Sequence, residues 1–130
     1  MSEVASTRRI MEKALQDNMP GTLCRFQNTP QFVAPKNKNW LEFTAGDVDR
    51  TQVAIPDCVR LAGLAVVLVN TPMGSGTREA EELCDQVITI YDLKTLDGEV
   101  TCLACDRIEV GQVDDWYQFH VLIPFYRTES

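Results

Sequence analysis

The segment CVRLAGLAVVLVNTP, residues Cys58–Pro72, constrains the fold of this chain more than any other stretch. It is rich in β-branched residues, and its second half is almost entirely apolar. This composition is typical of a strand that is covered on both faces, because a half-exposed strand alternates apolar with polar residues. We therefore expect a strand here that is covered on both faces, within a sheet that is backed by helices.

A helical pattern follows from Arg78 to Tyr91. Apolar residues recur there at intervals of three and four, which places them on one side of a helix. They are Ala80, Leu83, Cys84, Val87, Ile88 and Tyr91. Thr77 stands at the N-cap position, and the acidic residues after it complement the helix dipole. The pattern predicts a helix that packs its apolar side on the sheet.

The loop between this strand and this helix, Met73–Thr77, contains Gly74 and Gly76. Strand, glycine loop and helix occur in this order in many phosphate-binding sites. A Walker loop also requires a lysine after its last glycine, and Thr77 stands there instead. Acidic residues in the first helical turn would repel a phosphate. We interpret the loop as an ordinary helix start and predict no cofactor, with a small ligand-binding domain as the alternative.

The N-terminal half is predicted to contain a helix that begins after Ser2 and ends before Pro20, since proline cannot continue the hydrogen-bond ladder. Short strands are predicted at Leu23–Phe26 and Trp40–Phe43, with the polar loop Asn28–Lys38 between them. The polar segment Ala45–Pro56 is expected to form a hairpin tip or an extended arm.

The C-terminal part is predicted to form two strands, Val100–Val110 and Trp116–Tyr126, joined by a tight hairpin at Gly111–Asp115. A turn is expected at Leu96–Glu99. In the last strand, one face should be core and the other, with Gln118 and His120, wetter. The core positions are Tyr117, Phe119, Val121, Ile123 and Phe125.

The order of these elements predicts one α+β domain over residues 1–130. Its sheet is expected to be helix-backed and mainly antiparallel or mixed, with two helices and a long β-hairpin arm. The net charge of −7 and the pI near 4.6 argue against binding nucleic acid through its phosphates. No apolar run is long enough for a membrane span, and the first residues lack the apolar core of a secretion signal.

Five cysteines, an odd number, suggest reduced thiols in the cytoplasm. Cys102 and Cys105 have Cys-x-x-Cys spacing, but a three-residue offset within a strand sends side chains to opposite faces. We therefore predict two small buried residues and no metal site, with a redox domain as the alternative. His120 has no nucleophile motif beside it, and Asp114 and Asp115 suit a turn, so we predict no catalytic residues and no enzymatic activity.

Four groups of residues together resemble the tail terminator proteins of long-tailed bacteriophages, the lambda-like tail terminator family. They are the helix RRIMEKALQDNMP with the following LCRFQNTPQFVAP, the segment WLEF before the acidic arm, the strand–turn–helix LAGLAVVLVNTPMGSGTREAEELCDQVITIY, and the closing DDWYQFHVLIPFY. The resemblance spans roughly Ala5–Tyr126. It implies a structural virion protein of the tail and neck, assembled in the cytoplasm of a host bacterium. Such a subunit forms a ring, usually a hexamer, on the head-proximal end of the tail tube.

The same resemblance implies the partners: further copies of the chain, the tail tube protein and the head–tail connector or stopper protein. DNA would pass through the lumen only as cargo, and no membrane is involved. The ring would stop tube polymerisation and provide the surface for head–tail joining. Another neck or tail-completion connector protein is the alternative within this class. As interface residues we predict Trp40, Phe43, Asp47, Asp49 and Arg50, with core placement open for the two aromatic residues.

Overall fold

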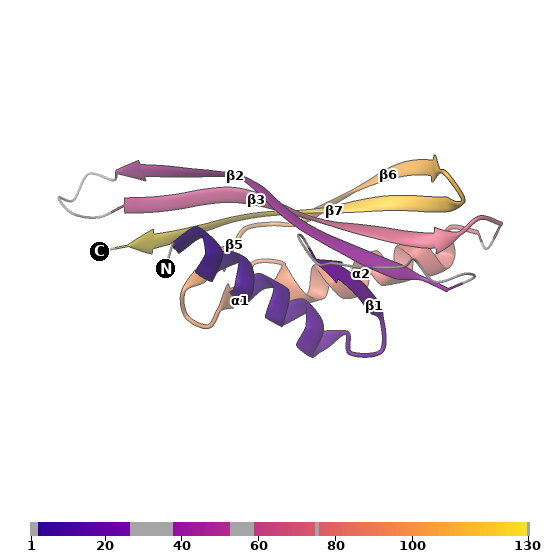
Figure 1. The fold of residues 1–130 in the computed structure, drawn as a ribbon, viewed down its shortest axis with the longest axis horizontal. Coiled ribbons are helices and arrows are strands. Elements are labelled where there is room, and N and C mark those ends of the chain that lie inside the picture. The colour runs from indigo at the N-terminus through magenta and orange to yellow at the C-terminus, as the bar shows by residue number, and fades with distance from the viewer. Residues whose placement is uncertain (1–2, 27–37, 53–58, 75, 130) are drawn as a thin grey trace.

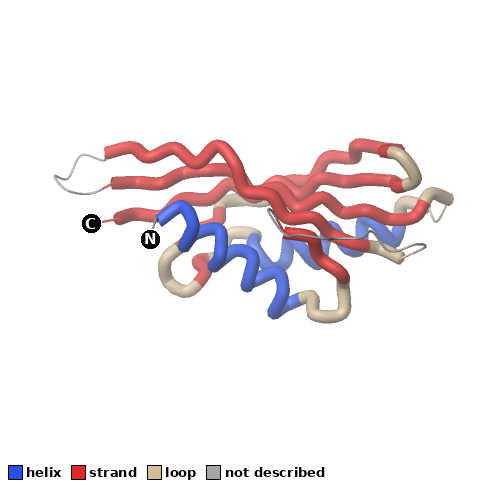
Figure 2. The backbone as a smooth tube through the Cα atoms, in the orientation of Figure 1, coloured by secondary structure: helices blue, strands red, loops and turns tan. Residues whose placement is uncertain are grey.

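The computed structural model of the protein describes residues 3–26, 38–52, 59–74 and 76–129. The described chain forms two helices and seven strands, and both helices lie on the same side of the sheet (Figures 1 and 2). In chain order the elements are α1 (Glu3–Asn18), β1 (Leu23–Phe26), β2 (Trp40–Gln52), β3 (Val59–Pro72), α2 (Arg78–Tyr91), β4 (Thr95–Leu96), β5 (Val100–Cys102), β6 (Asp106–Val113) and β7 (Trp116–Glu129). The predicted α+β class, with a helix-backed mixed sheet and a long hairpin, is confirmed.

The strands form one sheet in the order β1-β2-β3-β7-β5-β4, and β6 also pairs with β7. Only β1 and β2 run parallel, and every other pair is antiparallel. The central pair joins β3 to β7 along their whole length, from Val59 opposite Glu129 to Pro72 opposite Trp116. The strand predicted at Cys58–Pro72 is β3, whose described part begins at Val59, and it lies in the middle of the sheet.

Helix α2 has the predicted bounds, Arg78–Tyr91. Its first turn is closed by the backbone, because the Glu81 N–H donates to the Thr77 carbonyl at 2.9 Å, while the Thr77 side chain makes no capping hydrogen bond. The buried side of α2 differs slightly from the predicted side, because Ile90 is buried and Ile88 is only partly buried. The full buried set is Ala80, Leu83, Cys84, Val87, Ile90 and Tyr91.

The core lies between the two helices and one face of the sheet. β7 alternates as predicted, with Phe119, Val121, Ile123 and Phe125 buried on the helix side. The Tyr91 hydroxyl is also buried and donates to the Met11 carbonyl at 2.6 Å, which links α2 to α1. Burial raises the pKa of Tyr91 strongly, so this hydroxyl keeps its proton and serves as a structural donor.

The turn predicted at Leu96–Glu99 is confirmed, whereas the hairpin connection predicted at Gly111–Asp115 is limited to Asp114 and Asp115, because β6 continues to Val113. In the second turn, Val113 pairs with Trp116, and Asp114 has a φ of 53°, a conformation that aspartate tolerates better than most residues. The prediction of one strand over Val100–Val110 was wrong. β5 ends at Cys102, β6 begins at Asp106, and the interruption lets the Cys105 N–H donate to the Asp92 carboxylate at 2.8 Å.

Candidate assembly surface

The face of the sheet opposite the helices is not covered by any element that the structure describes (Figures 1 and 2). We call it the open face. Its centre consists of Leu64, Val66, Leu68, His120, Leu122 and Pro124. These side chains are half-buried, whereas their neighbours on the helix side are fully buried. The expectation that β3 is covered on both faces was therefore wrong for the described chain, because α1 and α2 both pack on one side.

The centre of the open face carries no charged residue. In one row across the sheet Leu68 lies between Glu42 and His120, and in the next row Val66 lies between Thr44 and Leu122. The Glu42 carboxylate, on the second strand, lies 3.8 Å from the Arg25 guanidinium, which offsets its charge. Asp106 of β6 lies beyond Leu122 at the border of the face, so the charges stand around the centre and not within it. A centre without charged residues is informative in a chain of net charge −7, since depletion of charge marks the centre of protein interfaces.

A chain of neutral polar groups crosses one end of the open face. The Gln118 side-chain Nε2 donates to the side-chain oxygen Oδ1 of Asn70 at 2.8 Å, and Oε1 of the same Gln118 amide lies 2.8 Å from His120 Nε2. Burial lowers the pKa of His120 below its ordinary value, so the imidazole is neutral at pH 7. Asn70 is 1% exposed, and its Nδ2 has no hydrogen-bond partner among the described residues.

Of the predicted interface aromatics, Trp40 lies at the edge of the open face and Phe43 does not. Trp40 packs edge-on against Trp116, with ring centroids 5.9 Å apart, and is 8% exposed. Phe43 lies on the helix side, is 0% exposed and packs against Phe26 at 6.3 Å. The core alternative therefore holds for Phe43, because the alternation of β2 directs it towards the helices.

The predicted interface residues Asp47, Asp49 and Arg50 lie in the second half of β2. Asp49 lies opposite Ala62 and Arg50 opposite Leu61 of β3, whereas Asp47 lies in the bulge between Gly46 and Asp49. The predicted arm is thus a continuation of the central sheet up to Gln52. Its tip, residues 53–56, and residues 28–37 of the predicted loop lie outside the described residues, as does Ser2.

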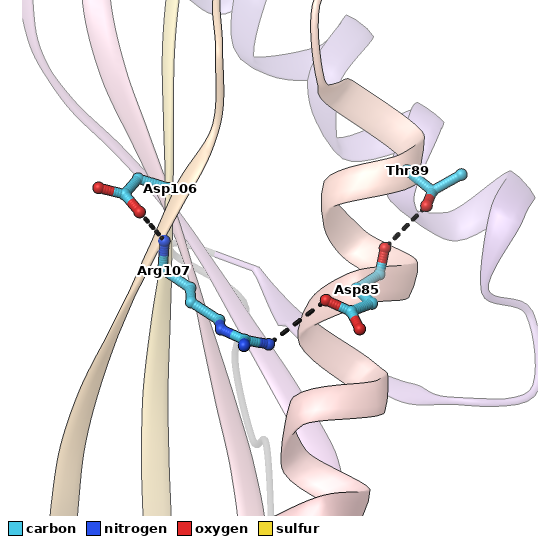
Figure 3. A network of polar contacts seen from close by, with 4 residues as sticks. All are labelled: Asp85, Thr89, Asp106 and Arg107. Atoms are coloured by element: carbon cyan, nitrogen blue, oxygen red, sulfur yellow. Dashed lines mark hydrogen bonds and ion pairs between the residues drawn. The ribbon is translucent and has the colours of Figure 1, made fainter.

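Strand β6 contributes a surface that sequence reasoning missed. Four of the exposed large apolar residues lie on it or just before it: Leu103, Ile108, Val110 and Val113. On the helix side, Arg107 lies 3.3 Å from Asp85 of α2 (Figure 3). The Asp85 carbonyl also accepts a hydrogen bond from the Thr89 hydroxyl at 2.8 Å. Alternating charges within DRIEV could have indicated an edge strand, since edges are often protected in this way.

The glycine loop continues directly into α2. Gly74 and Gly76 have φ values of 87° and 82°, which explains why glycine stands at both positions. Close to the loop, the Asn39 amide donates to the Glu79 carboxylate in the first turn of the helix at 2.5 Å. The described groups around this helix start therefore present a carboxylate, which disfavours an anionic ligand there.

The cysteine pair belongs to the core rather than to a reactive site. Cys102 is 1% exposed, and Cys105 packs against the same core from the interruption between β5 and β6. Both therefore lie on the helix side, contrary to the expectation of opposite faces, because the strand is broken between them. Burial raises the pKa of Cys102 to about 12 and that of Cys105 to about 11, so both remain thiols at neutral pH.

Within the described ranges, no group of three or more histidine, cysteine or acidic residues is placed to hold a metal ion. No helix in the described part of the chain is both long and apolar enough to cross a membrane. His120 contacts Gln118 and lies on the open face, away from the cysteines of the core.

Comparison with known proteins adds information on the fold. No family model matches the chain, and no curated protein matches it. A solved structure is similar, with a TM-score of 0.65 and 16% sequence identity, covering 95% of this chain and 96% of the other. The name of that protein states no function. The fold thus recurs over nearly the whole length of another chain.

Proposed function

We propose that this protein is a structural subunit that assembles into a ring on the head-proximal end of a bacteriophage tail tube, as a tail terminator. The observation that carries the proposal is the open face, a half-buried apolar surface whose centre carries no charged residue, on an acidic protein. A surface of this kind marks a site of contact with another protein.

The resemblance to tail terminators supports the more specific part of the proposal. The four residue groups that carry it fall on α1 with β1, on the start of β2, on β3 with α2, and on β7. They therefore include the central strands of the sheet and the start of the arm. A ring requires a heterologous interface, in which two different surfaces of the subunit meet and the rotation between copies closes.

In such a ring the fold would act by geometry alone. One side of the closed ring would occupy the growing end of the tube and prevent the addition of further tube subunits. The other side would offer a docking surface to the connector or stopper. An acidic lumen would repel the phosphates of the passing DNA and keep it from adhering. No step in this proposed mechanism requires bond formation or cleavage.

The experiment that tests the proposal combines solution mass with tube capping. Light scattering over a concentration series, with negative-stain images, should show a discrete ring of about six subunits, the number that the resemblance implies. Added to polymerising tail tubes of the same phage, the protein should fix their length. Tubes that grow equally long with and without the protein would contradict the proposal.

A matched pair of variants separates the arm from the fold. Reversing charge at Asp47 and Asp49 with lysine should weaken assembly and leave the monomer folded, because these residues lie on the arm. The control is the same reversal at Glu82, an exposed residue of α2. Equal assembly by both variants would exclude a role for the arm charges.

A further inference from the structure

The two longest strand edges that lack a neighbour in the described chain lie on opposite sides of the sheet, and the unpaired outer edges of β1 and β4 are shorter. The first is the outer edge of β6, which pairs only with β7. The second is the outer edge of β2 from Gly46 to Gln52, since β1 pairs with β2 only from Trp40 to Phe43. We call them the β6 edge and the arm edge. A strand edge with unpaired backbone groups is a template for a strand from another chain.

The β6 edge is prepared for such a contact in two ways. Ile108 is 49% exposed and Val110 43%, so apolar side chains accompany the backbone groups. The strand is also held in place, by its pairing with β7 and by the ion pair between Arg107 and Asp85 (Figure 3). An edge that is already ordered loses little conformational entropy when another strand pairs with it.

Strand direction makes the two edges compatible with each other. The strands β2, β3, β7 and β6 are neighbours in this order, and each runs antiparallel to the next. The first and the last of four alternating strands point in opposite directions. If two copies lie side by side in the same orientation, the β6 edge of one is therefore antiparallel to the arm edge of the next. The alternation then continues unbroken from copy to copy.

The two edges also lie at different positions along the strands, and this offset allows two copies to fit together. Ile108 of β6 lies level with Leu68 of β3, whereas Asp49 of the arm lies level with Ala62, about six residues further along β3. The side of β7 that pairs with β6 pairs with β5 further along the strand. In the same way, the outer side of β2 pairs with β1 before the arm edge begins. A shift of one copy along the strands brings the two edges together and moves β1 and β5 clear of each other.

The size of this shift agrees with a closed structure. Six residues correspond to about 20 Å along a strand, and four strands to about 19 Å across the sheet. If each copy is shifted along the strands by about as much as it extends across the sheet, the strands tilt by about 45° to the axis of the closed sheet. This tilt is at the upper end of the range found in closed barrels. A shift of this kind is what allows a continuous sheet to close on itself.

We propose that the β6 edge of one copy pairs with the arm edge of a second copy, so that the sheets of neighbouring subunits join into one continuous antiparallel sheet. This inference rests on the proposed ring and identifies its subunit interface. It assigns the partner as the same chain, because the chain itself supplies both edges with matching direction and offset. The contact is heterologous, as a ring requires.

Two edge variants test the inference. Ile108→Lys with Val110→Lys places charges on the β6 edge, and a proline at Arg50 or at Thr51 blocks the arm edge. Of two consecutive strand residues only one directs its N–H outward, so one proline variant should keep the monomer fold, as judged by its thermal unfolding. Leu93→Lys, at a residue that is 71% exposed and lies outside both edges, is the matched control.

Each edge variant alone should be monomeric under conditions in which the unaltered protein and Leu93→Lys assemble. An equimolar mixture of the two variants should form dimers and nothing larger, because each variant retains one intact edge. Light scattering distinguishes these species. Assembly of either variant on its own, or a mixture that stays monomeric, would overturn the inference.

Hydrogen exchange provides a second measurement that needs no substitution. Amide exchange of residues 46–52 and 106–113 should slow together when the unaltered protein passes from monomer to oligomer. A ring whose two edges exchange as in the monomer would overturn the inference and leave the terminator proposal standing. A chain that stays monomeric to millimolar concentration would also overturn it, while the capping of tail tubes would still test the proposed function separately.

Discussion

The two faces of the central sheet have similar side chains and very different surroundings. On the helix side of β3, Ala65, Val67 and Val69 are 0% exposed beneath α1 and α2. On the open face of the same strand, Leu64, Val66 and Leu68 are only half-buried. The comparison shows that apolar composition indicates how much of a strand is to be covered, and leaves open which molecule covers it. One half of the covering is supplied by this chain, and we propose that a partner protein in the assembly supplies the rest.

The largest expected difference between the faces is in the cost of truncation. Phe43→Ala removes a fully buried ring from the helix side and should destabilise the protein by about 3–5 kcal/mol, because it leaves a cavity. Leu68→Ala removes a half-buried side chain from the open face and should cost only about 1 kcal/mol in the monomer. Urea unfolding of dilute protein measures both, and equal costs would contradict the distinction between the faces.

A smaller effect is expected from the single hydrogen bond that joins the helices. Tyr91→Phe keeps the buried ring and removes the donor to the Met11 carbonyl. The carbonyl is then buried without this partner, so the free energy of unfolding should fall by about 1–3 kcal/mol. The control is Tyr117→Phe, because the Tyr117 hydroxyl bonds to Glu109 in an exposed position. A similar loss in both variants would show that burial of the Tyr91 bond is unimportant.

A charge in the centre of the open face should affect the monomer still less. Leu122→Lys places an ammonium group among half-buried side chains, from which the long lysine stem can reach water. The monomer should lose no more than about 1 kcal/mol. If the open face is covered in the assembly, the same variant should fail to form rings by light scattering. Rings of normal size would show that this part of the face remains uncovered.

The sequence predicted the parts of the fold that local pattern determines. The apolar periodicity of residues 78–91 is internal to the helix, so its bounds were predicted correctly, and the alternation of β7 likewise identified the buried residues. The interruption at Leu103–Cys105 was not predictable, because it depends on the distant carboxylate of Asp92. The placement of Phe43 depends on which face the helices cover, and this is decided by packing between elements far apart in the chain.

The candidate surface was predictable only in part, for a related reason. The arm was visible as a polar segment between strands, and the structure extends β2 through Asp49 and Arg50 as an arm requires. The open face was hidden, because its residues form the same apolar run as the core of β3. The pairing of β5 and β6 with one side of β7 is also a long-range property, so the unpaired β6 edge could not be identified from the sequence.

The smallest expected effect concerns the pH dependence of the open face. Burial lowers the pKa of His120 in the folded protein, so the unfolded chain binds a proton at this residue more readily. The free energy of unfolding is therefore unaffected by His120 above the pKa of the unfolded chain, about 6.5. It decreases as the pH falls below that pKa, because the unfolded chain then binds the proton more readily. Comparing unfolding by urea at pH 7.5 and pH 5.5, His120→Gln should lose less stability than the unaltered protein.

The same comparison distinguishes the monomer from the assembly. If the open face is covered in the ring, His120 is further desolvated there, and protonation should favour dissociation of the ring as well as unfolding of the monomer. Glu42, in the same row of the sheet, offsets this effect little because Arg25 already neutralises it. Rings of the unaltered protein should thus dissociate at a higher pH than rings of His120→Gln, as measured by light scattering. Identical pH profiles would place His120 outside the subunit contact, and the covered part of the sheet would then be limited to its edges.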